Sequence, residues 1–179
     1  MSLTIIPCRM EEAAALAALV NGAYRGIDGA GGWTSEIAVV AGLRATPAML
    51  ATDLADDAVT ILGLRESDTL LACVRLERVL GRSGTPACLI GMLAVHPARQ
   101  DCGLGRVMLE RAEQEALDRG VTLARMSVVS VRDSLIAWYE RRGYRRTGET
   151  EAFPYEDDRF GTPLRPDLAF VMLEKPLRD

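Results

Sequence analysis

Hydrophobic positions in the first half of the chain switch between helix-like and strand-like spacing. Apolar residues that recur every three or four positions predict amphipathic helices, whereas short runs rich in Val, Leu and Ile predict strands. Thr46 followed by Pro47 indicates a helix N-cap and a first helical residue. The predicted elements are, in order, a strand at 3–6, a helix at 11–26, a helical segment that starts at 34–36, a short helix at 47–55, and an antiparallel hairpin of strands at 59–65 and 70–79.

The second half of the chain places helices between apolar strands, with a glycine after each helix. A strand that is followed by a helix and another strand usually becomes the parallel neighbour of that second strand. The predicted elements are a strand at 88–95, a helix at 104–119, a strand at 123–131 parallel to the first, a helix at 133–142, and two last strands at 144–147 and 168–174. The long acidic and aromatic stretch at 149–167 is predicted to be a loop, and loops of this length in compact domains are usually functional or disordered.

The loop between the strand at 88–95 and the next helix has the pattern Gln100-x-x-Gly103-x-Gly105. A helix that opens directly from such a loop offers unpaired N–H groups and the positive end of its dipole, so it favours a phosphate. A dinucleotide fingerprint would need a third glycine at Met108, and the Gly-Lys-Ser/Thr ending of a nucleoside-triphosphate loop is absent. Ordinary turn glycines between a strand and a helix would produce the same pattern.

A second motif, Tyr139-x-x-x-Gly143-Tyr144, lies on the helix that follows the next strand. The order and separation of the two motifs, which span about 89–144, resemble the acyl-CoA motifs of the GNAT superfamily of N-acetyltransferases. The resemblance implies an α/β (α+β) GNAT fold over 1–179 as a single domain. Its mixed central sheet of about six to seven strands would be splayed at the acyl-CoA site and flanked by about four to five helices. The runs at 24–26 and 32–36 resemble a bacterial subgroup whose acceptors are mostly unassigned, while Arg132 and Asp133 replace an Asn common in the family.

The resemblance also implies acetyl-CoA as the donor of the acetyl group. Backbone N–H groups from Cys102 to Val107 would hold its pyrophosphate, and the strand edge at Leu93 to Val95 would bind its pantetheine arm. The implied cofactor-binding residues are Leu93, Ala94, Val95, Gln100, Asp101, Cys102, Gly103, Leu104, Gly105, Arg106, Val107, Ser134, Trp138 and Arg142.

Transfer by direct attack of an amine in a ternary complex needs a proton donor and a proton acceptor. Tyr139 matches the family's donor to the departing thiolate, although a tyrosine on an amphipathic helix is by default a core residue. Glu36 is the first candidate for the base, Glu77 is the second, and a water relay or His96 would serve the same purpose. A covalent route through Cys102 is the alternative mechanism, but no neighbouring residue offers the base that a nucleophilic cysteine needs.

The acceptor site is expected where aromatic residues and acids gather. Trp33, Phe153 and Tyr155 are the predicted substrate-binding residues, and nearby acids would attract a cationic primary amine of a small molecule or peptide. A solvated acidic loop accounts for the same charges without a substrate. These acids are Glu149, Glu151, Glu156 and Asp157.

Composition narrows the partners further. The 179 residues carry 21 Lys and Arg against 25 Asp and Glu, so the net charge of −4 disfavours nucleic acid. Four scattered cysteines and one histidine indicate neither a zinc site nor a disulfide framework. No apolar run approaches the ~20 residues needed to cross a bilayer, so we expect no membrane partner and a cytoplasmic protein. The resemblance leaves room for a homodimer, and the alternative function is a catalytically silent acyl-CoA-binding module.

Overall fold

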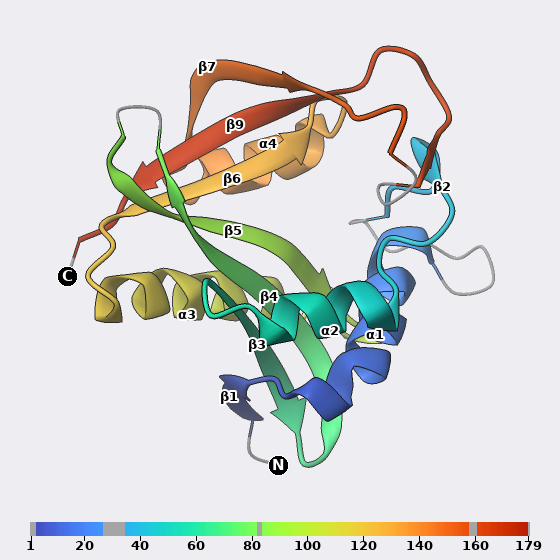
Figure 1. Ribbon diagram of the computed structural model, residues 1–179, viewed down its shortest axis with the longest axis vertical. Coiled ribbons are helices and arrows are strands. Elements are labelled where there is room, and N and C mark those ends of the chain that lie inside the picture. Colours follow the sequence, from blue (N-terminus) through green and yellow to red (C-terminus); the bar gives the residue numbers. More distant parts are fainter. Residues whose placement is uncertain (1–2, 27–34, 82–83, 158–160, 179) are drawn as a thin grey trace.

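The computed structural model describes residues 3–26, 35–81, 84–157 and 161–178 (Figure 1). The helices are α1 (Ala13–Arg25), α2 (Pro47–Ala55), α3 (Leu104–Asp118) and α4 (Asp133–Glu140), with short 3₁₀ turns at Met10–Glu12 and Pro97–Arg99. The strands are β1 (Leu3–Pro7), β2 (Val40–Ala41), β3 (Val59–Glu66), β4 (Thr69–Leu80), β5 (Pro86–Val95), β6 (Leu123–Val129), β7 (Arg145–Ala152), β8 (Thr162–Pro163) and β9 (Ala169–Pro176).

The central sheet has seven strands in the order β1-β3-β4-β5-β6-β9-β7, and four α-helices flank it. β5 and β6 pair in parallel, whereas the other neighbours pair antiparallel. The predicted α/β class, the mixed sheet, the hairpin and the parallel pair across α3 are therefore confirmed. Thr46 caps α2 as predicted, because its hydroxyl accepts a hydrogen bond from the Met49 N–H at 3.2 Å.

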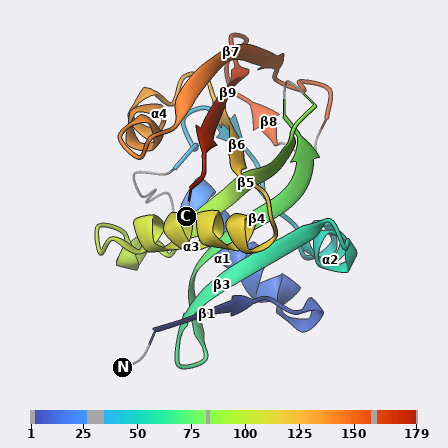
Figure 2. The same ribbon diagram turned by 90° about the vertical axis from the view of Figure 1, so that its left-hand side faces the viewer.

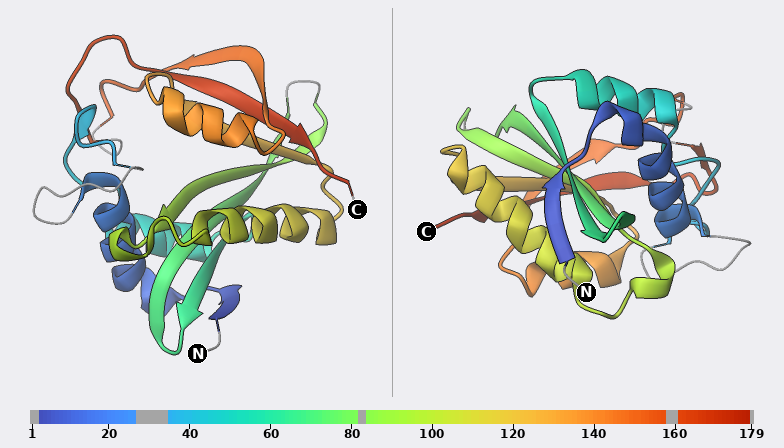
Figure 3. Two further views of the ribbon diagram at one scale, coloured as in Figure 1. Left: turned by 180° about the vertical axis from the view of Figure 1, so that it is seen from behind. Right: turned by 90° about the horizontal axis from the view of Figure 1, so that it is seen from below.

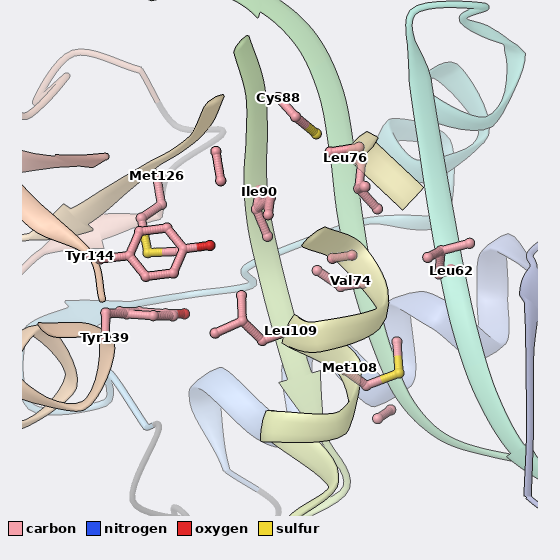
Figure 4. Packing of buried hydrophobic residues seen from close by; sticks show 14 of the residues in the cluster. Leu62, Val74, Leu76, Cys88, Ile90, Met108, Leu109, Met126, Tyr139 and Tyr144 are labelled. Atoms are coloured by element: carbon pink, nitrogen blue, oxygen red, sulfur yellow. The ribbon is translucent and has the colours of Figure 1, made fainter. Parts of the chain in front are cut away.

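Two hydrophobic cores cover the two faces of the sheet, because strand side chains alternate between the faces. One core joins α1 and α2 to the sheet through residues such as Leu16, Leu50 and Ile61. The other joins α3 and α4 to the opposite face, and the two helix pairs lie on opposite sides of the sheet in Figures 2 and 3. Figure 4 shows Met108 and Leu109 of α3 against the strands of this second core.

β5 and β6 separate soon after they meet, as Figure 1 shows. Their pairing is limited to Cys88 with Ala124 and Leu89 with Arg125, although both strands continue beyond these positions. A bulge in β5 accompanies the separation: the β4 partner of Gly91 is Arg75, that of Ala94 is Cys73, and Met92 between them has a φ of 49°. The predicted splay of the sheet is therefore present.

The predicted helix starting at 34–36 is wrong in the described part of that segment. The N–H groups of Val39 and Val40 both donate to the Glu36 carbonyl, which makes a single turn, and the chain then enters β2. Tertiary pairing overrides the local helix signal here, because Glu36 N–H donates to the Tyr24 carbonyl at 2.7 Å and β2 pairs with β8. Residue 34 lies outside the described residues.

The stretch at 149–167, which we predicted as a loop, contains the end of β7 and all of β8. Phe153 of this stretch packs at the end of β6 in a third hydrophobic cluster, which consists of Val40, Val129, Phe153 and Leu168. Within the described ranges, none of the helices has the length and apolar character that a membrane crossing requires.

Candidate functional site

Two cavities adjoin the end of β5, and one of them also lies between β5 and β6. The loop cavity, of about 480 Å³, lies between the glycine loop and α4. The α2 cavity, of about 600 Å³, extends toward α2, β7 and β9. Both are lined by the same four residues where they meet, which are Tyr24, Leu93, Leu135 and Tyr139. We call this shared wall the junction.

The glycine loop presents the start of α3 to the loop cavity. Gly103 caps the helix with a φ of 77°, a left-handed conformation that favours glycine over other residues. The N–H groups of Arg106 and Val107 donate to the Gly103 carbonyl at 3.1 and 3.2 Å. Among the described residues, no acceptor reaches the N–H groups of Leu104 and Gly105, so these free donors lie at the start of α3, in the middle of the predicted 102–107 range.

Eleven of the predicted cofactor-binding residues line the loop cavity and three do not. Ala94 packs into the core on the α1 side, Cys102 is exposed, and Val107 points away on α3. The lining residues from the prediction are Leu93, Val95, Gln100, Asp101, Gly103, Leu104, Gly105, Arg106, Ser134, Trp138 and Arg142.

Two backbone carbonyls at the end of β5, those of Leu93 and Val95, already accept hydrogen bonds from side chains. Gln100 Nε2 donates to the Val95 carbonyl at 3.2 Å, and the Tyr24 hydroxyl donates to the Leu93 carbonyl at 3.3 Å. These bonds fix the end of β5 and tie α1 to the junction. Tyr24 was not predicted as a site residue, since its position on α1 gave only a helical-core signal.

Four arginines, Arg99, Arg106, Arg141 and Arg142, line the loop cavity, and Asp101 is its one acid among the described residues. The Arg142 guanidinium lies 3.5 Å from the Trp138 ring centroid, and its Nη1 donates to the Trp138 carbonyl at 2.8 Å. Its Nε is buried without a partner, and burial together with Arg141 and Arg106 lowers the pKa of Arg142. Such a concentration of positive charge suits a phosphorylated ligand.

Tyr139 of α4 forms part of the junction. Its ring packs edge-to-face on Trp138 and Tyr144, with centroid distances of 5.0 and 5.8 Å. Within the described part of the chain, no group hydrogen-bonds to the Tyr139 hydroxyl. Burial is the main cause that raises the pKa of Tyr139, so the hydroxyl stays protonated at neutral pH and is able to donate.

Glu36 is a buried member of an ion triad on the wall of the α2 cavity. Arg25 Nη1 lies 2.8 Å from Glu36 Oε2, and Arg132 Nη1 lies 3.2 Å from Glu36 Oε1. Both carboxylate oxygens thus accept charged hydrogen bonds, so both are already engaged by partners within the fold. No local pattern predicted this triad, because Arg132 is 96 positions away from Glu36 in the sequence.

The other candidate bases are also engaged. Glu77 forms an ion pair with Arg75 at 2.6 Å, and Arg75 in turn makes two 2.9 Å contacts to Asp53. His96 Nδ1 accepts the Ala98 N–H at 3.2 Å and so caps the 3₁₀ turn.

The predicted acceptor residues separate in the structure. Phe153 is buried, lines the α2 cavity and stacks on Phe170 at 5.4 Å. Tyr155 lines neither cavity: its hydroxyl donates to the Arg165 carbonyl and accepts the Leu168 N–H, which braces the 153–168 segment. Trp33 lies outside the described residues.

Comparisons with known proteins agree with this geometry. No curated protein sequence matches the chain. Solved structures with a similar fold include the ribosomal-protein-S18-alanine N-acetyltransferase from Escherichia coli, with 18% identity and a TM-score of 0.69 over 99% of this chain and 96% of that one. An N-acetyltransferase from Staphylococcus aureus Mu50 has 16% identity and a TM-score of 0.70 over 98% of each chain.

A ribosomal-protein-alanine N-acetyltransferase from Brucella melitensis has 17% identity and a TM-score of 0.70 over 97% of this chain and 99% of that one. At these identities the likeness concerns the fold. The family model described as the acetyltransferase (GNAT) family matches residues 33–144, which is more than half of the chain and includes both motifs. The chain therefore belongs to the GNAT family of acetyltransferases.

Proposed function

We propose that the protein transfers the acetyl group of acetyl-CoA to a primary amine of a small molecule or peptide, by direct attack in a ternary complex. The observation that carries the proposal is the junction, where Tyr139 belongs to the walls of both cavities. A donor in the loop cavity and an acceptor in the α2 cavity would meet at this hydroxyl. The similar structures are named as N-acetyltransferases, which supports an amine as the acceptor.

The loop cavity fits a CoA thioester on features of its own. The unpaired N–H groups at the start of α3 and the partnerless Nε of Arg142 are donors that phosphate oxygens would satisfy. Leu93, Val95 and Leu135 give the cavity apolar lining that would suit the pantetheine arm. When bound, acetyl-CoA supplies an acyl carbon that is activated by its thiol leaving group.

Tyr139 acts in this proposal as the proton donor to the departing sulfur. A free thiol has a pKa of about 8.5, so the thiolate is a better leaving group when a hydroxyl donates to it. The raised pKa of Tyr139 keeps that proton available at neutral pH.

The amine must lose a proton before or during attack, since an alkylamine with a pKa of about 10.4 is almost fully charged at pH 7. The ion pairs of Glu36 and Glu77 favour water in the α2 cavity as the acceptor of that proton. Glu36 would then be a positioning residue that holds α1, β2 and the start of α4 together. Cys102 is exposed and lines neither cavity, which favours direct attack over a cysteine acyl-enzyme.

Release of CoA thiol from acetyl-CoA across a panel of primary amines tests the activity. The Tyr139→Phe variant is expected to lose roughly 10²-fold or more in turnover while acetyl-CoA affinity is kept. Tyr144→Phe is the matched control, because its hydroxyl donates to Glu113 at 2.9 Å and lines neither cavity. Saturable acetyl-CoA binding without thiol release for any amine would favour the silent binding module, and wild-type turnover in Tyr139→Phe would remove this residue from the mechanism.

A further inference from the structure

Among the described residues, one arginine that lines the α2 cavity has no hydrogen-bond or ion-pair partner for its guanidinium. Arg44 is half-buried and lines this cavity, yet its guanidinium forms no hydrogen bond or ion pair with the residues that the structure describes. The guanidinium lies over the Tyr24 ring, whose centroid is 5.4 Å from the guanidinium carbon. A cation–π contact of this kind leaves all five N–H donors of the guanidinium available.

The other charged residues of the cavity are almost all committed to partners. Arg25 and Glu36 belong to the triad with Arg132, Asp53 and Arg75 form a two-bond pair, and Arg125 contacts Glu149 and Glu174 at 2.6 Å each. Glu151 is the remaining lining acid, and it is exposed on β7, where solvent screens its charge. Half-buried Arg44 therefore offers the stronger unsatisfied group to a ligand.

The backbone at Arg44 is held in place from α1. Asn21 Oδ1 accepts the N–H groups of Arg44 and Ala45 at 2.7 and 3.1 Å, and Asn21 Nδ2 donates to the Ala45 carbonyl at 2.8 Å. The Thr46 cap of α2 follows immediately. A guanidinium on a fixed backbone loses less entropy on binding than one on a loose loop.

Arg44 also lies close to the junction. It packs over Tyr24, whose hydroxyl bonds to Leu93, and both of these residues line the loop cavity as well. Arg44 and Arg132 both act electrostatically on the Tyr24 hydroxyl. An acceptor amine placed at the junction would therefore have a cationic, planar hydrogen-bond donor about one side chain away.

From this arrangement we infer that the acceptor carries a carboxylate next to its amine, as a free α-amino acid does, and that Arg44 binds this carboxylate. The planar fork of a guanidinium matches the two oxygens of a carboxylate, and a charge-assisted pair of bonds orients as well as attracts. Apolar residues such as Met49, Leu50 and Phe153 leave room on the same wall for an apolar side chain. The inference rests on the proposed function and specifies its substrate class.

A matched series of acceptors tests the inference. Methionine, methioninamide and 3-(methylthio)propylamine share one apolar body and differ in the group beside the amine, and 1,4-diaminobutane represents a polycation. The wild-type protein is expected to prefer methionine over the amide at least 30-fold in kcat/KM. In Arg44→Met this preference should fall to within about threefold, mainly through KM, while the rate with the amide stays within twofold.

Control variants separate a contact from a general charge effect. Arg145→Met removes an exposed arginine of β7 that lines neither cavity, and it should leave the preference unchanged. Arg44→Lys should retain part of the preference, since it keeps the charge but not the fork. Equal rates for methionine and its amide, or a preference for 1,4-diaminobutane that Glu151→Gln removes, would overturn the inference while leaving the amine acetyltransferase intact.

An equilibrium measurement tests the same contact without turnover. Calorimetry with the CoA-saturated protein should show N-acetylmethionine binding at least tenfold more tightly than N-acetylmethioninamide, and the difference should vanish in Arg44→Met. Absence of thiol release with every amine, together with this Arg44-dependent binding, would reject the proposed function and keep the carboxylate site. Equal binding of the two compounds to the wild-type protein would reject the carboxylate site itself.

Discussion

Replacing Glu36 with glutamine separates a positioning role from a role as the catalytic base. The substitution leaves two arginines, Arg25 and Arg132, with side chains 9% and 7% exposed, facing a neutral group. Removing one partner of a buried ion pair costs about 3–5 kcal/mol. Because the amide oxygen still accepts one bond, we expect about 3 kcal/mol less unfolding free energy, or roughly 6–12 °C in Tm for a chain of this size.

Glu140→Gln is the matched control, since it makes the same chemical change in the exposed pair with Arg146. Its cost should stay within about 1 kcal/mol. Urea unfolding at pH 7, followed by circular dichroism, measures both variants. A Glu36→Gln cost as small as that of the control would refute the buried triad.

The pH dependence of kcat/KM distinguishes the two roles of Glu36 in the folded enzyme. If water accepts the amine proton, kcat/KM should rise with pH between about 7 and 9 in both wild type and Glu36→Gln, because the neutral amine fraction increases. A loss of kcat of roughly 10²-fold or more in folded Glu36→Gln across this pH range would instead identify Glu36 as the base.

Two further measurements test the loop and the buried tyrosines. Gly103→Ala places a side chain at a φ of 77° and should weaken acetyl-CoA binding, measured by calorimetry, about tenfold. Gly84→Ala, with a φ of 74° in the β4–β5 turn, should lower stability by a similar amount without changing the affinity. Equal acetyl-CoA affinities of the two variants would contradict the loop assignment. Burial raises the pKa of Tyr24 to about 12 and raises those of Tyr139 and Tyr144 as well, so the unfolded chain, with phenol pKa values of about 10, loses these protons first. The stability that these protonated phenols give to the fold is complete below pH 10. It should be lost as the pH rises toward 12, by up to about 1.4 kcal/mol per pH unit for each phenol. Tyrosinate absorbance showing that all four phenols of the folded protein are ionised near pH 10 would contradict this expectation.

Most of the residues that line the loop cavity were predictable because their signals are local in sequence. A strand, a glycine turn and a helix start lie within a few residues of one another, so Gln100, Gly103 and Gly105 are brought together by backbone geometry alone. Tyr139 was identified through the resemblance of Tyr139-x-x-x-Gly143-Tyr144 to the family's second acyl-CoA motif, and its role as proton donor stays a prediction. The direction of the side chains at the end of β5 was not predictable, because it depends on the bulge at Met92. Ala94, which we predicted to bind the cofactor, packs into the core on the α1 side.

The acceptor side depends on contacts between distant segments. The Glu36 triad combines residues from α1, the β2 turn and the residue before α4, and the small β2–β8 sheet joins segments more than a hundred residues apart. Neither leaves a periodic pattern in the sequence. The acidic residues of 149–167 were predicted as an attraction for cations, yet Glu149 is paired with Arg125 in the structure.

A charged residue informs about a ligand only after its partners within the fold are known. Counting acids near the aromatic residues predicted a cation-attracting wall, whereas assigning each ion pair leaves Arg44 as the half-buried charge of the α2 cavity that no described partner satisfies. The Arg44 donors are accessible to solvent, and a carboxylate that replaces this solvent gains charge-assisted hydrogen bonds. Specificity in this acetyltransferase is thus expected to follow from the unsatisfied donors at Arg44 more than from the net charge of the cavity.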